Sequence, residues 1–190
     1  MSKDRKQIIL QSLAKLLEER DATKVTTAVL AAESGITEAA LYRHFPSKRS
    51  IFLELFSFCD QTIFQKVGDI KKDADIDPEE KVRLIFFFYA IFLEKNKGFA
   101  RILSREALGP SEQNVIDSVN QFYERLELSI KQLLSSKKDS LQLTAGQSAH
   151  LITTIMEGMI SRFIRNKFKE IPSGYIENYW SLISSSIFKS

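Results

Sequence analysis

The sequence has few of the residues that interrupt helices or crosslink a chain. Its 190 residues include one cysteine, seven glycines and four prolines. A single cysteine excludes an intramolecular disulfide, and because Cys59 lies beside Phe58 in an apolar pattern, we expect a buried structural thiol rather than a reactive one. Few glycines and prolines leave long uninterrupted stretches, which favour helices throughout.

Motifs of catalysis and metal binding are also absent from the sequence. It contains no HExxH motif, no glycine-rich phosphate loop and no cysteine–histidine pair. The two histidines are His44 and His150, and we expect His150 at a surface or interface. Without a candidate general base or a set of metal ligands, we expect no enzyme, no metal and no cofactor, and catalysis is the disfavoured alternative.

No apolar run has the length of a membrane span. The most apolar one, residues 84–93, is ten residues long, whereas about 20 are needed to cross a bilayer. The N-terminal MSKDRKQ is charged, and no apolar core with a small-residue cleavage site follows it. We therefore expect no signal peptide and a cytoplasmic location.

The net charge of +3 is concentrated near the N-terminus. Residues 1–50 contain nine lysines and arginines against six acidic residues, whereas residues 51–190 contain 18 of each. All of the net positive charge therefore lies in the first quarter of the chain. This distribution suits a DNA-binding segment, although so small an excess does not establish one.

Residues 25–48 (VTTAVLAAESGITEAALYRHFPSK) have the spacing of two short helices joined by a tight turn, with a third helix directly after. Thr26 or Thr27 can cap the first helix and Thr37 the second, because a threonine hydroxyl accepts a bond from a free backbone N–H. Gly35 stands where the turn requires a positive φ. The pattern predicts a helix-turn-helix motif, and the alternative is an unrelated helical hairpin with a glycine turn.

The second helix of this motif has two different faces. Leu41 and Phe45, four residues apart, can pack on a core, while Ala39, Tyr42 and Arg43 point roughly the other way. Short alanines allow a close approach to base edges, arginine can bond a base or a phosphate, and Tyr42, His44 and Lys48 can donate to phosphates. The predicted DNA-binding residues are Thr26, Thr27, Thr37, Glu38, Ala39, Ala40, Tyr42, Arg43, His44 and Lys48.

The rest of the chain shows only helical periodicity, with no strand pattern or repeat. We expect helices over residues 3–20, 47–70, 78–96, 99–108, 111–134, 143–168 and 173–188, in addition to the two of the motif. The predicted fold is therefore all-α with about nine helices: a DNA-binding domain at 1–48 and a body for dimerisation and partner binding at 49–190. Residues 84–93 are apolar on every side, which predicts a helix in the middle of this body.

The last two helices carry more apolar surface than one small body needs. A two-fold dimer formed by both helices would bury it, and the alternative is a self-contained core. The predicted dimer residues are Ile155, Met156, Met159, Ile160, Phe163, Tyr179, Trp180 and Ile183.

The segment from Gly35 to Lys48, GITEAALYRHFPSK, closely resembles the DNA-binding signature of TetR-type regulators. Further segments resemble one group in that family, the SlmA-like nucleoid occlusion factors: ILQSLAKLLE (9–18), EAALYRHFPSK (38–48), EKNKGFARIL (94–103) and EGMISRFIRNKFK (157–169). This resemblance implies a homodimer that binds palindromic DNA on the nucleoid. It also implies binding of the C-terminal tail of FtsZ, which inhibits assembly of the division septum over the chromosome.

In the resembling group, the FtsZ tail lies in a groove between the fourth and fifth helices. By position, the groove residues here are Phe58, Lys66, Phe88, Lys95 and Asn96. The phenylalanines offer apolar contacts and the lysines suit an acidic tail, but arginines are expected at 66 and 95 in the group, and an ammonium pairs less well with a carboxylate. From the residues alone, both phenylalanines are more typical of a core and both lysines of an ordinary solvated surface. The alternative function is a ligand-gated TetR-type repressor, which requires a pocket in the body.

Overall fold

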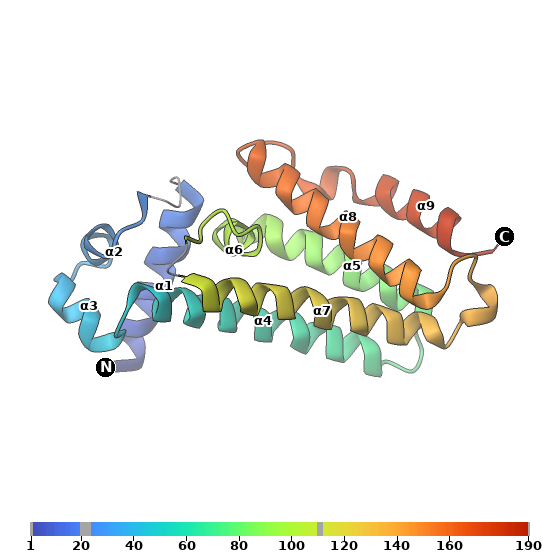
Figure 1. Ribbon diagram of the computed structural model, residues 1–190, viewed down its shortest axis with the longest axis horizontal. Helices are drawn as coiled ribbons and strands as arrows, with labels where there is room; N and C mark the ends of the chain where they lie inside the picture. Colours follow the sequence, from blue (N-terminus) through green and yellow to red (C-terminus); the bar gives the residue numbers. More distant parts are fainter. Residues whose placement is uncertain (1, 20–23, 110–111, 190) are drawn as a thin grey trace. The chain divides into compact units, whose positions relative to one another are not determined.

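The computed structural model describes residues 2–19, 24–109 and 112–189, and these contain nine α-helices (Figure 1). The helices are α1 (Ser2–Glu19), α2 (Thr27–Glu33), α3 (Glu38–His44), α4 (Lys48–Lys72), α5 (Pro78–Lys95), α6 (Lys97–Leu103), α7 (Gln113–Ser135), α8 (Ala145–Arg165) and α9 (Ile176–Ile187). Short 3-10 turns at Lys138–Ser140 and Pro172–Gly174 precede α8 and α9. The predicted all-α fold is confirmed. No helix within the described ranges combines the length and apolar character of a membrane span.

The chain divides into two compact units. Unit 1 contains Met1–Gln61 and Asn96–Val119, and unit 2 contains Thr62–Lys95 and Asn120–Ser190. Helices α4 and α7 each contribute to both units. The predicted domain boundary after residue 48 therefore falls inside unit 1, which also includes a segment from the middle of the chain.

Unit 1 is built around the apolar face of α1. Leu13, Leu16 and Leu17 on this face are fully buried. Helix α6 packs against α1 so closely that a Cβ atom on Gly98 would lie 2.5 Å from the carbonyl oxygen of Ala14. Gly98 is therefore required by packing, because any side chain would force the two backbones apart.

Unit 2 is built around α5, which contacts both α8 and α9. The buried face of α5 includes Phe86 and Tyr89, and the Phe86 ring centroid lies 6.0 Å from that of Trp180 on α9. The hydroxyl oxygens of Tyr89 and Tyr123 lie 3.1 Å apart inside the core. Burial raises the pKa of Tyr89 well above its ordinary value, so this hydroxyl stays protonated.

The opposite face of α5 corrects the expectation of a helix enclosed on all sides. Leu84, Phe88 and Phe92 are only half-buried, and Ile91 is 38% exposed. The rings of Phe88 and Phe92 lie 5.6 Å apart. A helix that is apolar on every side is therefore not enclosed on every side in this chain, because one of its faces stays partly exposed.

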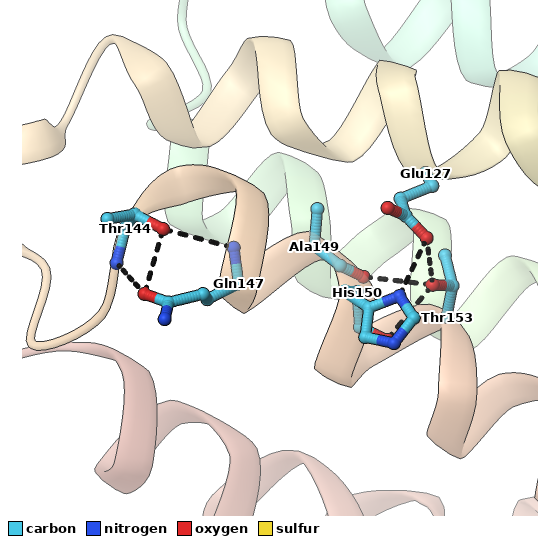
Figure 2. Close-up of polar contacts among 6 residues, drawn as sticks. All are labelled: Glu127, Thr144, Gln147, Ala149, His150 and Thr153. Carbon is cyan, nitrogen blue, oxygen red and sulfur yellow. Dashed lines mark hydrogen bonds and ion pairs between the residues drawn. The ribbon is translucent and has the colours of Figure 1, made fainter.

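Helix α8 begins with a capping box and is bonded to α7 (Figure 2). Thr144 Oγ1 accepts a bond from the backbone N–H of Gln147 at 3.2 Å, and the Gln147 side chain accepts one from the Thr144 N–H at 3.1 Å. Nine residues after Thr144, Thr153 Oγ1 donates to Glu127 Oε2 of α7 at 3.0 Å, and His150 Nδ1 lies 3.3 Å from the same oxygen. His150 itself is exposed, as predicted.

Candidate nucleic-acid interface

The helix-turn-helix is formed by α2, a glycine turn and α3, as the capping residues predicted. Thr26 caps α2 by accepting a bond from Val29 N at 3.2 Å, and Thr37 caps α3 by accepting one from Ala40 N at 3.2 Å. Gly35 has a φ of 65° and ends α2 in the left-handed conformation that glycine adopts at little cost. Of the two threonines that can cap α2, the structure selects Thr26.

The α3 helix presents its short and polar residues outward. Glu38, Ala39, Tyr42 and Arg43 are exposed, whereas Ala40 and His44 are half-buried. Thr26 and Thr37 are also exposed and Thr27 is half-buried, so every predicted DNA-binding residue of α2 and α3 keeps some accessible surface. This surface lies on the side that a recognition helix turns toward a major groove.

The opposite side of α3 packs against the rest of unit 1. Leu41 is fully buried, Phe45 is 2% exposed, and Leu30 of α2 is 1% exposed. Lys6 of α1 places its Nζ 5.1 Å from the centroid of the Phe45 ring, a cation–π contact that ties α1 to the end of α3. The predicted division of α3 into a buried and an exposed face is therefore confirmed.

A hydroxyl network that the sequence did not predict joins α2 to α3. Thr27 Oγ1 donates a hydrogen bond to Glu38 Oε1, and Tyr42 Oη donates to Thr27 Oγ1 at 3.5 Å. Glu38 and Tyr42 are one turn apart on α3, so a single threonine of α2 contacts both. The sequence showed only that Glu38 and Tyr42 are four residues apart. Their contact with Thr27 could not be predicted, because it depends on how α2 and α3 cross.

The start of α4 completes the interface. Ser47 and Ser50 cap it reciprocally, with Ser50 N bonded to Ser47 Oγ at 3.1 Å and Ser47 N bonded to Ser50 Oγ at 3.2 Å. Lys48 is half-buried and holds its Nζ 5.3 Å from the Phe52 ring centroid. Its ammonium therefore lies beside the first turn of a 25-residue helix, where a phosphate is electrostatically favoured.

Comparison with known proteins agrees with this geometry. The family model described as bacterial regulatory proteins, tetR family, matches residues 9–55, and an SlmA-like model described as tetracyclin repressor-like, C-terminal domain, matches residues 78–187. The nucleoid occlusion factor SlmA of Vibrio cholerae is 37% identical to this chain, covering 97% of this chain and 96% of its own length. The SlmA of Klebsiella pneumoniae is also 37% identical, with the same coverage.

The chain belongs to the TetR family. Its C-terminal part is of the SlmA-like type. Membership in this family of DNA-binding regulators also confirms that the chain is not an enzyme.

Solved structures of TetR-type regulators share the fold. The multidrug-efflux repressor NalD of Pseudomonas aeruginosa superposes with a TM-score of 0.81 over 99% of both chains at 16% identity. The fatty acid degradation regulator FadR of Bacillus halodurans superposes with a TM-score of 0.78 over 94% of both chains at 14% identity. At such identities the likeness shows the fold alone.

The predicted FtsZ-tail residues are divided between the two units. Phe58 and Asn96 belong to unit 1, whereas Lys66, Phe88 and Lys95 belong to unit 2. Phe58 is 65% exposed, which excludes its alternative role as a core residue. Lys66, Lys95 and Asn96 are exposed and Phe88 is half-buried, so all five side chains keep accessible surface.

The predicted dimer residues require a correction. Met156, Met159, Ile160, Phe163, Trp180 and Ile183 are at most 7% exposed within the single chain, so they form the core of unit 2. Only Ile155 and Tyr179 are half-buried. The exposed surface of α8 and α9 carries Thr154, Gly158 and Ser161, together with Leu182, which is 67% exposed.

Proposed function

We propose that this protein is a nucleoid occlusion factor: a DNA-bound homodimer that binds the C-terminal tail of FtsZ and antagonises division-ring assembly over the chromosome. The observation that carries the proposal is the 37% identity to the SlmA of Vibrio cholerae over nearly the full length of both chains. Such coverage includes the helical body as well as the DNA-binding head. It therefore supports FtsZ as a shared binding partner, in addition to the shared binding of DNA.

The helix-turn-helix supports the DNA-binding half of the proposal. Small side chains at Ala39 and Ala40 let α3 approach base edges, and Arg43 is exposed beside them. Lys48 at the start of α4 can donate to a backbone phosphate. Two such heads in a dimer would contact two half-sites of a palindrome, about one helical turn apart or a multiple of it.

The surface residues of α4 and α5 support the FtsZ half. Phe58 presents an aromatic ring to solvent, and α5 has a partly open apolar face that includes Phe88 and Phe92. Exposed Lys66 and Lys95 supply positive charge for an acidic peptide. Accessible aromatic side chains and positive charges are the groups that bind a short acidic and apolar segment.

The dimer is proposed to form through the outer surface of α8 and α9. A Cβ atom added at Gly158 would have no neighbour within 4 Å, so the isolated chain does not require glycine there. A partner helix that approaches closely would require it. Leu182, two-thirds exposed, would be covered in the same interface.

The alternative, a ligand-gated repressor, requires a pocket in the body. In the middle of unit 2, Ile85, Phe86 and Ala90 of α5 are fully buried, and Tyr89 is bonded to Tyr123. These side chains fill the interior around α5 and favour the division inhibitor. A small molecule that binds the purified protein and releases it from DNA would support the alternative.

The proposal is tested by titrating a synthetic FtsZ C-terminal tail peptide with the full-length protein, with and without bound palindromic DNA. The wild-type protein should bind the peptide, and Phe58→Glu should abolish binding while DNA affinity stays unchanged. The matched control is Leu128→Glu on α7, because Leu128 is also an exposed apolar residue, at 51%. It should bind the peptide as the wild type does.

Two results would contradict the proposal. A wild-type protein that binds palindromic DNA but not the FtsZ tail would leave only the DNA-binding regulator. Equal loss of peptide binding in the Phe58 and Leu128 variants would show a general effect of surface charge and would remove Phe58 from the site.

A further inference from the structure

Glu38 is an unusual residue for the surface it occupies. It is exposed on the DNA-facing side of α3, in the part of the chain that carries the whole net positive charge. A carboxylate there repels phosphates, so it weakens binding to every DNA sequence alike. Its position in the first turn of α3 suits the helix dipole, but the shorter aspartate would satisfy that requirement equally well.

The structure also restrains this carboxylate. Thr27 Oγ1 donates to Glu38 Oε1, and Thr27 is half-buried at the first turn of α2. The described part of the chain supplies no bond to Oε2. One oxygen is thereby fixed by the protein, and the other remains as an acceptor on the surface that is turned toward DNA.

Tyr42 makes the arrangement directional. Its hydroxyl donates to Thr27 Oγ1 at 3.5 Å, so the Thr27 proton is directed to Glu38. The chain of donors runs from Tyr42 through Thr27 to the carboxylate. Because the Thr27 hydroxyl both accepts and donates, its orientation is defined. It can therefore hold the Glu38 carboxylate in one orientation, whereas a solvent-exposed glutamate without such a bond would rotate freely.

We propose that Glu38 is a specificity-determining residue that accepts a hydrogen bond from the exocyclic amine of a cytosine in the major groove, and that Thr27 is its positioning residue. Cytosine N4 is the donor that glutamate and aspartate recognise on base edges. The repulsion of phosphates then has a function: it penalises sequences that offer no amine to offset it. This inference rests on DNA binding by α3, and it adds the base that one residue selects.

The test is a selection of binding sites from random duplex DNA by the full-length protein. Wild type, Glu38→Gln, Thr27→Val, Thr27→Ser and Lys48→Ala are compared, and affinities are then measured on the selected duplex and its single-base variants at one salt concentration. Wild type should select cytosine at one position of each half-site. Replacing that cytosine should weaken wild-type binding about 5- to 100-fold, the range of one base contact.

The variants give distinct expected results. Glu38→Gln should change the selected base from cytosine to adenine, because a side-chain amide pairs with adenine. Thr27→Val should lower discrimination at that position alone, and Thr27→Ser, which keeps the hydroxyl, should restore it. Lys48→Ala should weaken binding to all duplexes alike, as expected for a phosphate contact.

Two outcomes overturn the inference. If the Glu38→Gln protein selects the same base as the wild type at every position, Glu38 contacts no base. Thr27→Val and Glu38→Gln that weaken all duplexes equally, as Lys48→Ala does, show that the network only holds α2 against α3. A wild-type protein that selects no motif at all instead overturns sequence-specific binding, on which the inference depends.

Discussion

Replacing Gly98 with alanine should destabilise the protein, although alanine is the better helix former. The added Cβ would lie 2.5 Å from the carbonyl oxygen of Ala14 and 3.0 Å from its Cα, and both are backbone atoms that cannot rotate away. Helices α1 and α6 would have to separate. Overpacking of this kind costs about 1–3 kcal/mol, and the better propensity of alanine returns up to about 1 kcal/mol.

We therefore expect Gly98→Ala to lower the free energy of unfolding by about 1–2 kcal/mol. The matched control is Gly68→Ala in α4, where an added Cβ meets nothing within 4 Å. That substitution should raise the free energy of unfolding by about 0.5–1 kcal/mol. The same chemical change thus has opposite signs at two helical positions.

Urea denaturation followed by far-ultraviolet circular dichroism measures both effects, with the midpoint and slope fitted for each variant. Variants that shift in opposite directions support the close approach of α1 and α6. A Gly98→Ala protein as stable as the wild type would refute it, because the backbones would then be further apart than described.

Two further predictions concern the surface of α9 and the buried thiol. Leu182→Glu should convert the dimer to a monomer, as measured by light scattering, with little loss of monomer stability because Leu182 is 67% exposed. The control protein Leu128→Glu should stay dimeric. A Leu182→Glu protein that stays dimeric would place the interface elsewhere. Burial raises the pKa of Cys59 from 9.0 to about 12, so native protein at pH 8 should resist thiol reagents that label it in denaturant. Because the folded pKa lies above the unfolded one, this thiol's contribution to stability is full below pH 9 and declines as the pH rises toward 12; rapid native labelling at pH 8 would contradict its burial.

The local features of the helix-turn-helix could be predicted from the sequence because their signals lie within a few residues. Thr26, Gly35 and Thr37 act on backbone groups at most three positions away, so their order determines where α2 ends and α3 begins. The exposed face of α3 followed from its period of 3.6 residues. The same reasoning found Ser47 at the start of α4.

The dimer residues show what periodicity cannot decide. The apolar stripe of α8, with Met156 and Ile160, was correctly identified as buried. A stripe shows that a helix face is covered, but its own chain and a partner chain cover it with the same kinds of side chain. Here the chain's own α5 contacts α8, so the prediction was wrong about what covers these residues.

Contacts between distant segments were also beyond the sequence. The Thr27–Glu38 bond depends on how two helices cross, and the role of Gly98 depends on Ala14, more than 80 residues earlier. Phe58 gave a misleading signal of the opposite kind, because an aromatic residue beside a buried cysteine is 65% exposed.

The place of α6 in unit 1 affects how the DNA-binding head is made in the cell. During synthesis, residues 1–61 leave the ribosome well before Gly98 and its neighbours, which belong to the same compact unit. Until they emerge, the surface of α1 around Ala14 has no cover. Unit 1 therefore cannot complete its folding until α6 has been synthesised. A chain truncated before α6 would expose the apolar face of α1 to chaperones and proteases.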